Sequence, residues 1–137
     1  MNRRVSLITL ALVGTASLTL TGCAKAEPPT PRFKTAIEKC DIRGEDGVEY
    51  ADQGASLILS TAGEDDFGSG MITWSDVECV LKRTKATEAT LNRMLSTRAL
   101  DGLQDASWKG VEASWTYHPD NGFNISLEDT ALEDAMD

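Results

Sequence analysis

The clearest pattern along the chain is an alternation of apolar and polar side chains, with period two, in its C-terminal third. Two alternating runs, 111–118 and 123–128, flank the turn-forming sequence Pro119-Asp120-Asn121-Gly122. Their apolar positions are Val111, Ala113, Trp115 and Tyr117, then Phe123, Ile125 and Leu127. The pattern predicts a β-hairpin with one buried face. We expect Gln104–Trp108 to join it as a third strand through the Lys109-Gly110 turn.

Apolar residues at helical spacing mark a short segment nearer the N-terminus. Its apolar stripe consists of Phe33, Ala36, Ile37 and Cys40. Thr30 is suited to cap this helix and Pro31 to occupy its first position, because the fixed φ of proline matches a helix and its missing N–H would be unpaired there anyway. We therefore expect a helix with Cys40 on its buried side.

Two further helices are expected in the middle of the chain. Thr73 followed by Asp76 forms a capping-box pattern, with Asp in place of the preferred Glu, and the helix that it begins should end around Arg83. A second helix should run from about Thr87 with three side chains turned inward: Leu91, Met94 and Leu95. The link 84–86 is short, which predicts a compact corner between the two.

Between these helical segments the pattern is that of a hairpin followed by a loop. Residues 48–50 and 56–61 flank the turn 51–54, and 57–59 is their most apolar stretch. The acidic, glycine-rich stretch 63–70 is typical of a surface loop. Together the elements predict a small single α+β domain over residues 32–128.

The expected order within this domain is an N-terminal helix, a β-hairpin, two short helices and a C-terminal antiparallel β-meander. Residues 129–137 carry four acids and no base after the last alternating position. We expect them to form an acidic tail that frays or makes one loose turn.

A different pattern precedes the domain. Arg3 and Arg4 are followed by a mostly apolar run, Val5–Leu20, which has the layout of a secretory signal and is short for a spanning helix. Its end, Leu20-Thr21-Gly22-Cys23, resembles the bacterial lipobox. That resemblance implies a signal peptide over 1–22, cleavage before Cys23, and lipid on this cysteine at the extracytoplasmic face of the cell membrane.

The alternative to a lipid anchor is a plain secreted protein with a chance cysteine. The paired arginines suggest twin-arginine export, but the flanking residues match that signal badly, so the route of export is open. Residues 23–31 contain three prolines, and such a segment favours extended polyproline conformation. It is therefore expected to act as a Pro-rich tether between the lipid on Cys23 and the domain.

Acidic residues outnumber basic ones. The chain has 13 Lys and Arg against 22 Asp and Glu, a net charge of −9. Loss of Arg3 and Arg4 with the leader would leave 11 basic residues and a net charge of −11. Such a surface repels nucleic acid phosphates and anionic lipid headgroups, so neither is an expected partner. A basic protein or another envelope component is the expected partner class, unless the charge serves solubility alone.

Three cysteines allow an assignment that uses all of them. With Cys23 lipidated, Cys40 and Cys79 are an even pair in an oxidising compartment, where disulfides persist. Their loop of about 40 residues would remove roughly 4 kcal/mol of denatured-state entropy in the loop-closure model. Two free buried thiols are the alternative.

Catalytic and metal-binding chemistry is sparse in this sequence. His118 is the only histidine, which excludes a His-dependent triad and a His-rich metal site. An EF-hand loop with Gly122 at its sixth position would need ligands from Tyr117 and Pro119, which supply none. We expect no enzyme activity, no cofactor and no metal. The rival class is an envelope enzyme or a calcium-dependent glycan-binding protein.

Four residues are candidates for a binding surface: Trp74, Arg98, Asp120 and Asn121. Tryptophan stacks on glycan rings, but in a small domain it more often packs in the core. Arg98 lies near Asp101, so a local ion pair competes with a contact to a partner. Asp120 and Asn121 are also the residues that a turn requires for its own geometry.

Three stretches from Trp74 onward stand out together: Asp76, Cys79, Val80 and Leu81 on the second helix, then 96–102, then 113–122. In them the chain resembles small uncharacterised lipoproteins of actinobacteria and of their temperate phages. The resemblance implies a lipidated, disulfide-stapled domain and transfers no catalytic residue.

The function expected from these observations is a non-catalytic binding or blocking module, tethered at the cell surface. The resemblance suggests phage exclusion or envelope modification as its role. The acidic charge makes inhibition of a basic cell-wall hydrolase such as lysozyme the alternative.

Overall fold

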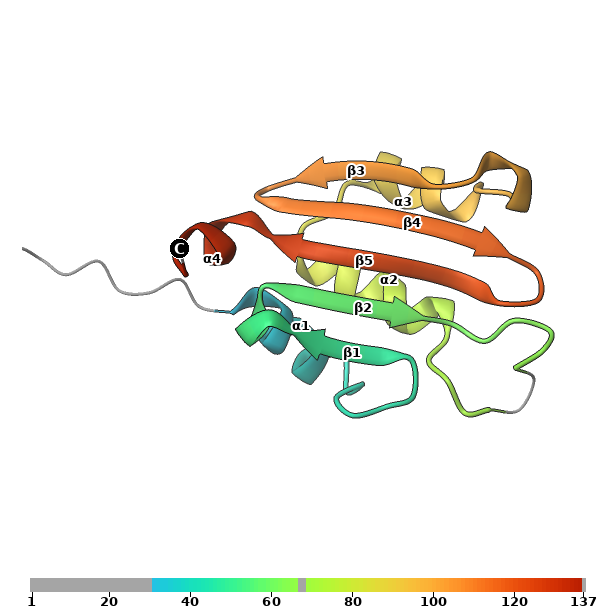
Figure 1. Ribbon diagram of the computed structural model, residues 1–137, viewed down its shortest axis with the longest axis horizontal. Coiled ribbons are helices and arrows are strands. Elements are labelled where there is room, and N and C mark those ends of the chain that lie inside the picture. Colours follow the sequence, from blue (N-terminus) through green and yellow to red (C-terminus); the bar gives the residue numbers. More distant parts are fainter. Residues whose placement is uncertain (1–30, 67–68, 137) are drawn as a thin grey trace, which may run out of the picture.

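The computed structural model describes residues 31–66 and 69–136 and shows two layers, an antiparallel five-stranded sheet and a layer of helices (Figure 1). The α+β class predicted from the sequence is thereby confirmed. The elements are α1 (Arg32–Lys39), β1 (Val48–Ala51), the 3-10 helix η1 (Asp52–Gly54), β2 (Ser56–Ser60), α2 (Trp74–Arg83), α3 (Glu88–Leu95), the 3-10 helix η2 (Ala99–Asp101), β3 (Gln104–Trp108), β4 (Val111–His118), β5 (Gly122–Asp129) and α4 (Thr130–Asp134). Among the described residues, no helix combines the length and the apolar character needed to cross a membrane.

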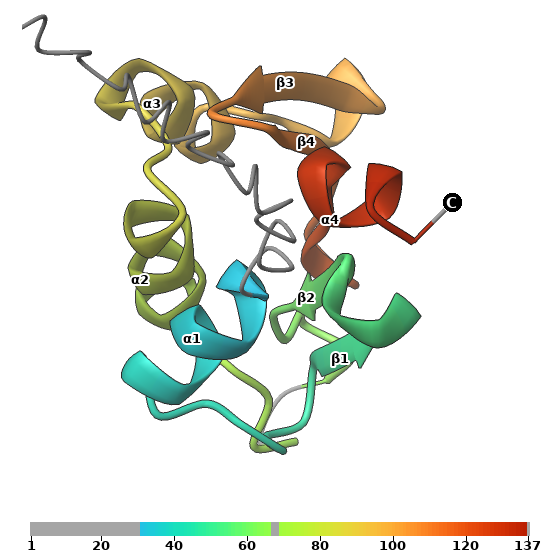
Figure 2. The ribbon, with the colours of Figure 1, turned by 90° about the vertical axis from the view of Figure 1, so that its left-hand side faces the viewer.

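The helices α1, α2 and α3 all cover the same face of the sheet (Figure 2). The alternation along the strands explains this, because every second side chain of a strand points to one face. The inward set is buried and apolar: Leu57, Leu59, Val111, Ala113, Trp115, Phe123, Ile125 and Leu127. The helices contribute Phe33, Ile37, Val77, Val80, Leu81, Leu91 and Met94 to the same core. The opposite side of the sheet, which we call the outer face, has none of these three helices on it.

The two predicted β units form one sheet of order β1-β2-β5-β4-β3. The junction is the antiparallel pair β2–β5, in which Leu57 lies opposite Leu127 and Leu59 opposite Ile125. The local patterns predict the hairpin and the meander separately. Their union depends on contacts between residues about 70 positions apart in the chain.

The predicted disulfide is present. It joins Cys40, which follows α1, to Cys79 in α2, with a separation of 39 residues along the chain. The capping pattern is also present, since the Thr73 N–H donates to the Asp76 carboxylate at 2.8 Å. The cap stabilises the start of α2, and the disulfide holds the middle of α2 to the end of α1.

The first helix is held to the far end of the chain. Arg32 Nε donates to Asp129 Oδ2 at 2.7 Å, and Arg32 Nη1 donates to the Lys109 carbonyl at 2.6 Å. Asp129 is only 2% exposed, and its backbone N–H donates to the Ala55 carbonyl at 2.7 Å. The last residue of β5 therefore brings together α1, the β1–β2 connection and the β3–β4 turn.

The chain departs from the expected boundaries at both ends of the domain. Pro31 is the N-cap of α1 and Arg32 its first helical residue, one position later than predicted. Residues 129–134 are not a loose tail, because Asp129 completes β5 and α4 buries Leu132. The Asp129 carboxylate caps this last helix by accepting from the Leu132 N–H at 3.4 Å. The prediction of a frayed tail relied on the acid-rich composition, which does not show that the Asp129 carboxylate pairs with Arg32 and caps α4.

Helix α3 is fixed to the sheet by polar contacts of two tryptophans. Trp108 Nε1 donates to the Thr84 carbonyl at 3.1 Å, just before α3. Arg93 lies over the ring of Trp115, 4.9 Å from its centroid, and its guanidinium donates to the Asp105 carbonyl of β3. These contacts place the C-terminal end of α3 beside the start of β3.

Two side chains predicted to be buried are exposed. Leu95 is 58% exposed, because it is the last residue of α3 and lies past the part of the helix that packs on the sheet. Tyr117 is 39% exposed near the end of β4. In both cases the periodicity continues to the end of the element, but the covering layer does not.

Candidate functional site

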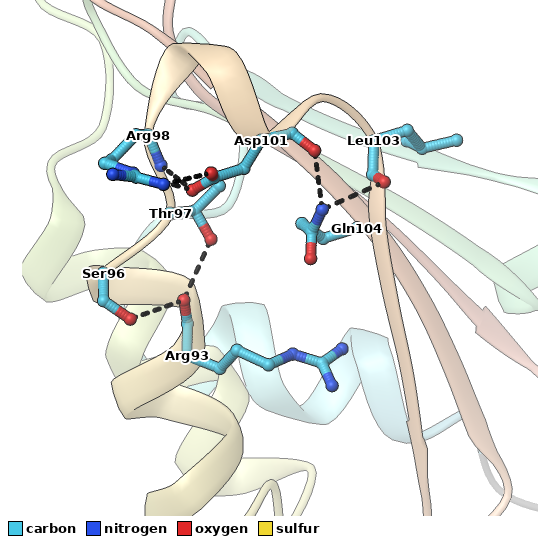
Figure 3. Close-up of polar contacts among 7 residues, drawn as sticks. All are labelled: Arg93, Ser96, Thr97, Arg98, Asp101, Leu103 and Gln104. Carbon is cyan, nitrogen blue, oxygen red and sulfur yellow. Dashed lines mark hydrogen bonds and ion pairs between the residues drawn. The ribbon is translucent and has the colours of Figure 1, made fainter.

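The connection between α3 and β3, residues 96–103, forms a compact loop around η2, which we call the η2 loop (Figure 3). The Arg98 N–H donates to Asp101 Oδ2 at 2.7 Å, and Arg98 Nη2 pairs with Asp101 Oδ1 at 2.9 Å. The Asp101 N–H in turn donates to the Arg98 carbonyl at 2.9 Å. One arginine and one aspartate thus close the loop through both side-chain and backbone atoms.

Both sides of the η2 loop are attached to the domain. Thr97 Oγ1 donates to the Arg93 carbonyl at 2.9 Å and accepts from Trp115 Nε1 at 2.9 Å. On the other side, Gln104 Nε2 donates to the Asp101 carbonyl at 2.8 Å (Figure 3). Because Trp115 is almost fully buried, the loop is fastened to the core of the protein.

The ion pair of the loop is stable in its charged form. The hydrogen bond from Arg98 lowers the pKa of the Asp101 carboxyl below its ordinary 3.8, with further contributions from the backbone N–H and the charge of Arg98. The same carboxylate raises the pKa of the Arg98 guanidinium. Both groups are therefore ionised throughout the neutral range.

The η2 loop and its flanks expose three leucines. Leu100 is 96% exposed, Leu103 is 70% exposed, and Leu95 immediately before the loop is 58% exposed. The Leu103 side chain points away from the Arg98–Asp101 pair (Figure 3). Single exposed leucines are common on protein surfaces, but three on one ordered connection mark a surface that is suited to bind another molecule.

Leu103 also borders a shallow apolar groove on the outer face. Its other lining side chains come from the central strands and are mostly small: Ile58, Ser60, Ser114, Thr116, Asn124 and Ser126. The register explains the groove, because Ile58 lies opposite Ser126 and Ser126 opposite Ser114. Short side chains in the middle of a sheet leave a hollow between the longer ones at either side.

Three carboxylates lie on the outer face next to this groove. They belong to Asp105, Glu112 and Glu128, which line a second hollow that shares Ser114 and Ser126 with the first. Glu112 and Glu128 face each other directly across β4 and β5. Within residues 31–66 and 69–136, none of the three has an ion-pair partner.

The four predicted binding residues lie in three separate sets of contacts. Trp74 is half-buried and packs edge-on against Phe123, with ring centroids 5.1 Å apart. Arg98 forms the local ion pair of the η2 loop. Asp120 and Asn121 are exposed in the β4–β5 turn. No contact in the described part of the chain brings these three sets together.

The β4–β5 turn is supported by the loop that follows β2. The Glu64 N–H donates to the Pro119 carbonyl at 2.9 Å, and the Asp65 N–H to the Asp120 carbonyl at 3.2 Å. The Asp120 N–H donates to His118 Nδ1 at 3.2 Å. These contacts give Asp120 a role in the turn itself.

Two predicted features concern metal and lipid. Among the described residues, no group of three or more His, Cys, Asp or Glu side chains is arranged to hold a metal ion. Cys23, the signal peptide 1–22 and nearly all of the tether 23–31 lie outside the described residues.

Sequence reasoning missed Leu100 and Leu103. The signal was present, since the two leucines lie on either side of Gly102, in a stretch from Ser96 to Leu103 that is otherwise typical of a loop. An isolated leucine in a loop does not indicate whether it turns inward or outward. Only the attachment of this loop through Thr97 shows that the leucines are held in solvent.

Comparison of the chain with protein-family models, with curated proteins and with solved structures found no match.

Proposed function

We propose that this protein is a non-catalytic binding or blocking module, held by lipid on Cys23 at the extracytoplasmic face of the cell membrane. The observation that carries the proposal is the η2 loop, which keeps Leu100 and Leu103 in solvent on an ordered backbone. Binding through an ordered loop loses little conformational entropy, and exposed apolar side chains supply the buried contact area. Such a loop is suited to insert into a hollow of a partner.

The position of the η2 loop supports an outward-facing role. The described chain begins at Pro31 beside α1, and Arg32 contacts Lys109 at the end of β3. The η2 loop lies at the opposite end of β3, before Gln104 (Figure 1). A tether that joins the domain at Pro31 therefore leaves the exposed leucines directed away from the membrane.

The resemblance to actinobacterial and phage lipoproteins suggests phage exclusion or envelope modification as the cellular role.

Mass spectrometry and fractionation test the anchor. The protein from its own host is expected to carry a diacylglyceryl group on Cys23 and to sediment with membranes. The Cys23→Ser variant is expected in the soluble fraction. An unmodified Cys23 in the mature wild-type protein would contradict the anchor while leaving the binding role to be judged separately.

Capture from envelope extract tests the binding role. The immobilised wild-type domain is expected to retain a defined partner, and the double variant Leu100→Ser/Leu103→Ser is expected to lose it. Met136→Ser is the matched control, because Met136 is another exposed apolar residue, outside the loop. Equal capture by the double variant and the wild type would contradict a role for the loop.

The carboxylates of the outer face favour one alternative, inhibition of a basic cell-wall hydrolase such as lysozyme. Charge attraction between the two proteins would be strong at low salt and screened at high salt. Muramidase assays at both salt concentrations test it. Full enzyme activity at low salt with excess domain present excludes this alternative.

A further inference from the structure

We propose that the outer face docks a basic protein, with an apolar side chain of the partner in the groove beside Leu103 and cationic side chains over Glu112 and Glu128. The inference rests on the proposed binding function and identifies the partner chemistry and the contact surface for it. The groove is bordered by Leu103 of the η2 loop, and it shares Ser114 and Ser126 with the hollow that the carboxylates line.

The register fixes the order of side chains across the groove. One row across the sheet runs from Ile58 through Ser126 and Ser114 to Asp105. The residues of this row are either short or at its ends, so the middle is open. Leu103 lies on the same side as Asp105, two positions earlier in the chain. A partner segment that lies across the strands would contact Ile58 on one side of the groove and Leu103 on the other.

The next row brings two like charges together. Glu128 and Glu112 are directly opposite on β5 and β4, and Ser56 and Ser107 flank them. Like charges at directly opposite positions destabilise a sheet. A lysine or arginine of a partner placed between the two carboxylates would replace this repulsion with attraction on both sides.

Charge complementarity identifies the partner class. The five strands contain no lysine or arginine, but they contain five acids: Glu49, Asp105, Glu112, Glu128 and Asp129. Asp129 is paired with Arg32, and the other four are exposed. A polyanion or an anionic membrane would be repelled from this face. A protein segment that combines an apolar residue with lysine or arginine matches both halves of the groove.

The experiment uses egg-white lysozyme and cytochrome c as defined basic probes and measures their affinity for the protein by calorimetry at about 0.1 M ionic strength, where the screening length is about 10 Å. The outer-face variant is Asp105→Asn/Glu112→Gln/Glu128→Gln. It is expected to bind at least one probe about tenfold more weakly than the wild type does, since the contacting charges are removed.

A matched control separates the surface from the net charge. Asp41→Asn/Glu88→Gln/Glu133→Gln removes the same number of exposed negative charges outside the strands. It is expected to change the affinity by less than about threefold, because distant surface charges are screened. Leu103→Ser tests the apolar half and should weaken binding by about tenfold. Circular dichroism checks that each variant is folded.

Three results would overturn the inference. They are an absence of wild-type binding to both probes, an equal loss in the two triple variants, and unchanged affinity in the outer-face variant. If the domain binds neither probe but still captures an envelope partner through Leu100 and Leu103, the inference about basic partners fails and the proposed function stands. If capture also fails, both fall.

Discussion

Two Arg–Asp pairs of similar geometry lie at opposite ends of the domain and have different structural roles. Arg32 and Asp129 are 97 residues apart in the chain and 2.7 Å apart in space, with Asp129 buried. Arg98 and Asp101 are three residues apart, at 2.9 Å, and the Arg98 side chain is 79% exposed. The first pair joins the two ends of the fold, and the second shapes a single loop.

The comparison shows that the distance between the charged atoms does not determine how much an ion pair contributes to the free energy of unfolding. Loss of Arg32 leaves the buried Asp129 carboxylate without its cation, which is costly. Loss of Arg98 leaves the Asp101 carboxylate in contact with water, so its cost in unfolding free energy is small. The long-range pair should therefore affect unfolding and the local pair should affect binding.

Removal of the disulfide is expected to have the largest effect on the long-range side of the comparison, because it frees the helix that carries Arg32. The Cys40→Ser/Cys79→Ser variant should lose about 4 kcal/mol of unfolding free energy, from the loop of 39 residues that the disulfide closes. Urea unfolding of oxidised wild type and variant measures it. A loss below about 1 kcal/mol would mean that the contacts of α1 hold without the covalent link.

Arg32→Ala is expected to lower the unfolding free energy by about 2 kcal/mol, less than for a fully buried pair because Arg32 is partly exposed. Arg43→Ala is the control, since Arg43 forms an exposed pair with Glu38, and its effect should stay within about 0.5 kcal/mol. Equal effects of the two substitutions would remove the distinction between the buried and exposed pairs. Urea unfolding again provides the measurement.

Arg98→Ala is expected to leave the unfolding free energy without a resolvable change, because the pair is exposed. Binding should weaken instead, since the loop that holds Leu100 loses the side-chain contact from Arg98 Nη2 to Asp101 Oδ1 and keeps only the backbone contacts between these two residues. The expected loss is about fivefold to tenfold in affinity for the captured partner. Unchanged affinity would show that the leucines do not need an ordered loop.

The smallest expected effect is a pH dependence confined to acid. The pKa of Asp101 is lowered from 3.8 by Arg98, so the folded carboxylate stays ionised below the pH at which the unfolded one gains its proton. Its contribution is complete above pH 3.8 and disappears as the pH falls through the folded pKa. Leu100 methyl signals followed by NMR should keep their positions down to that range. A titration midpoint of these signals above pH 3.8 would contradict the ion pair between Arg98 and Asp101.

Local patterns predicted most of the elements because their causes are local. Alternation along 111–118 reports which side of a strand is buried, and Thr73 with Asp76 satisfies the free N–H groups of its own helix. The pairing of β2 with β5 has no such local signature. The burial of Asp129 has no local signature either, because its partner Arg32 lies 97 positions earlier in the sequence.

The candidate site likewise contains features that the local sequence predicts and features that depend on contacts between distant residues. The pairing of Cys40 with Cys79 was predictable because the expected lipidation of Cys23 leaves only these two cysteines, and the expected extracytoplasmic location favours a disulfide between them. The outward side of the strands follows from the alternation, but the placement of the groove next to Leu103 and the carboxylates requires the register of four strands. Leu95 failed as an inward residue because periodicity gives its direction and not the extent of the neighbouring layer.

The bond from Arg93 to the Asp105 carbonyl affects how molecules of this protein meet one another at high concentration. β3 is an outermost strand of an open sheet, and such strands recruit strands of other molecules through their free backbone groups. The guanidinium occupies one of these acceptors and places a positive charge beside the strand. Addition of a strand from a second molecule along β3 is thereby disfavoured, because that strand would have to displace the guanidinium.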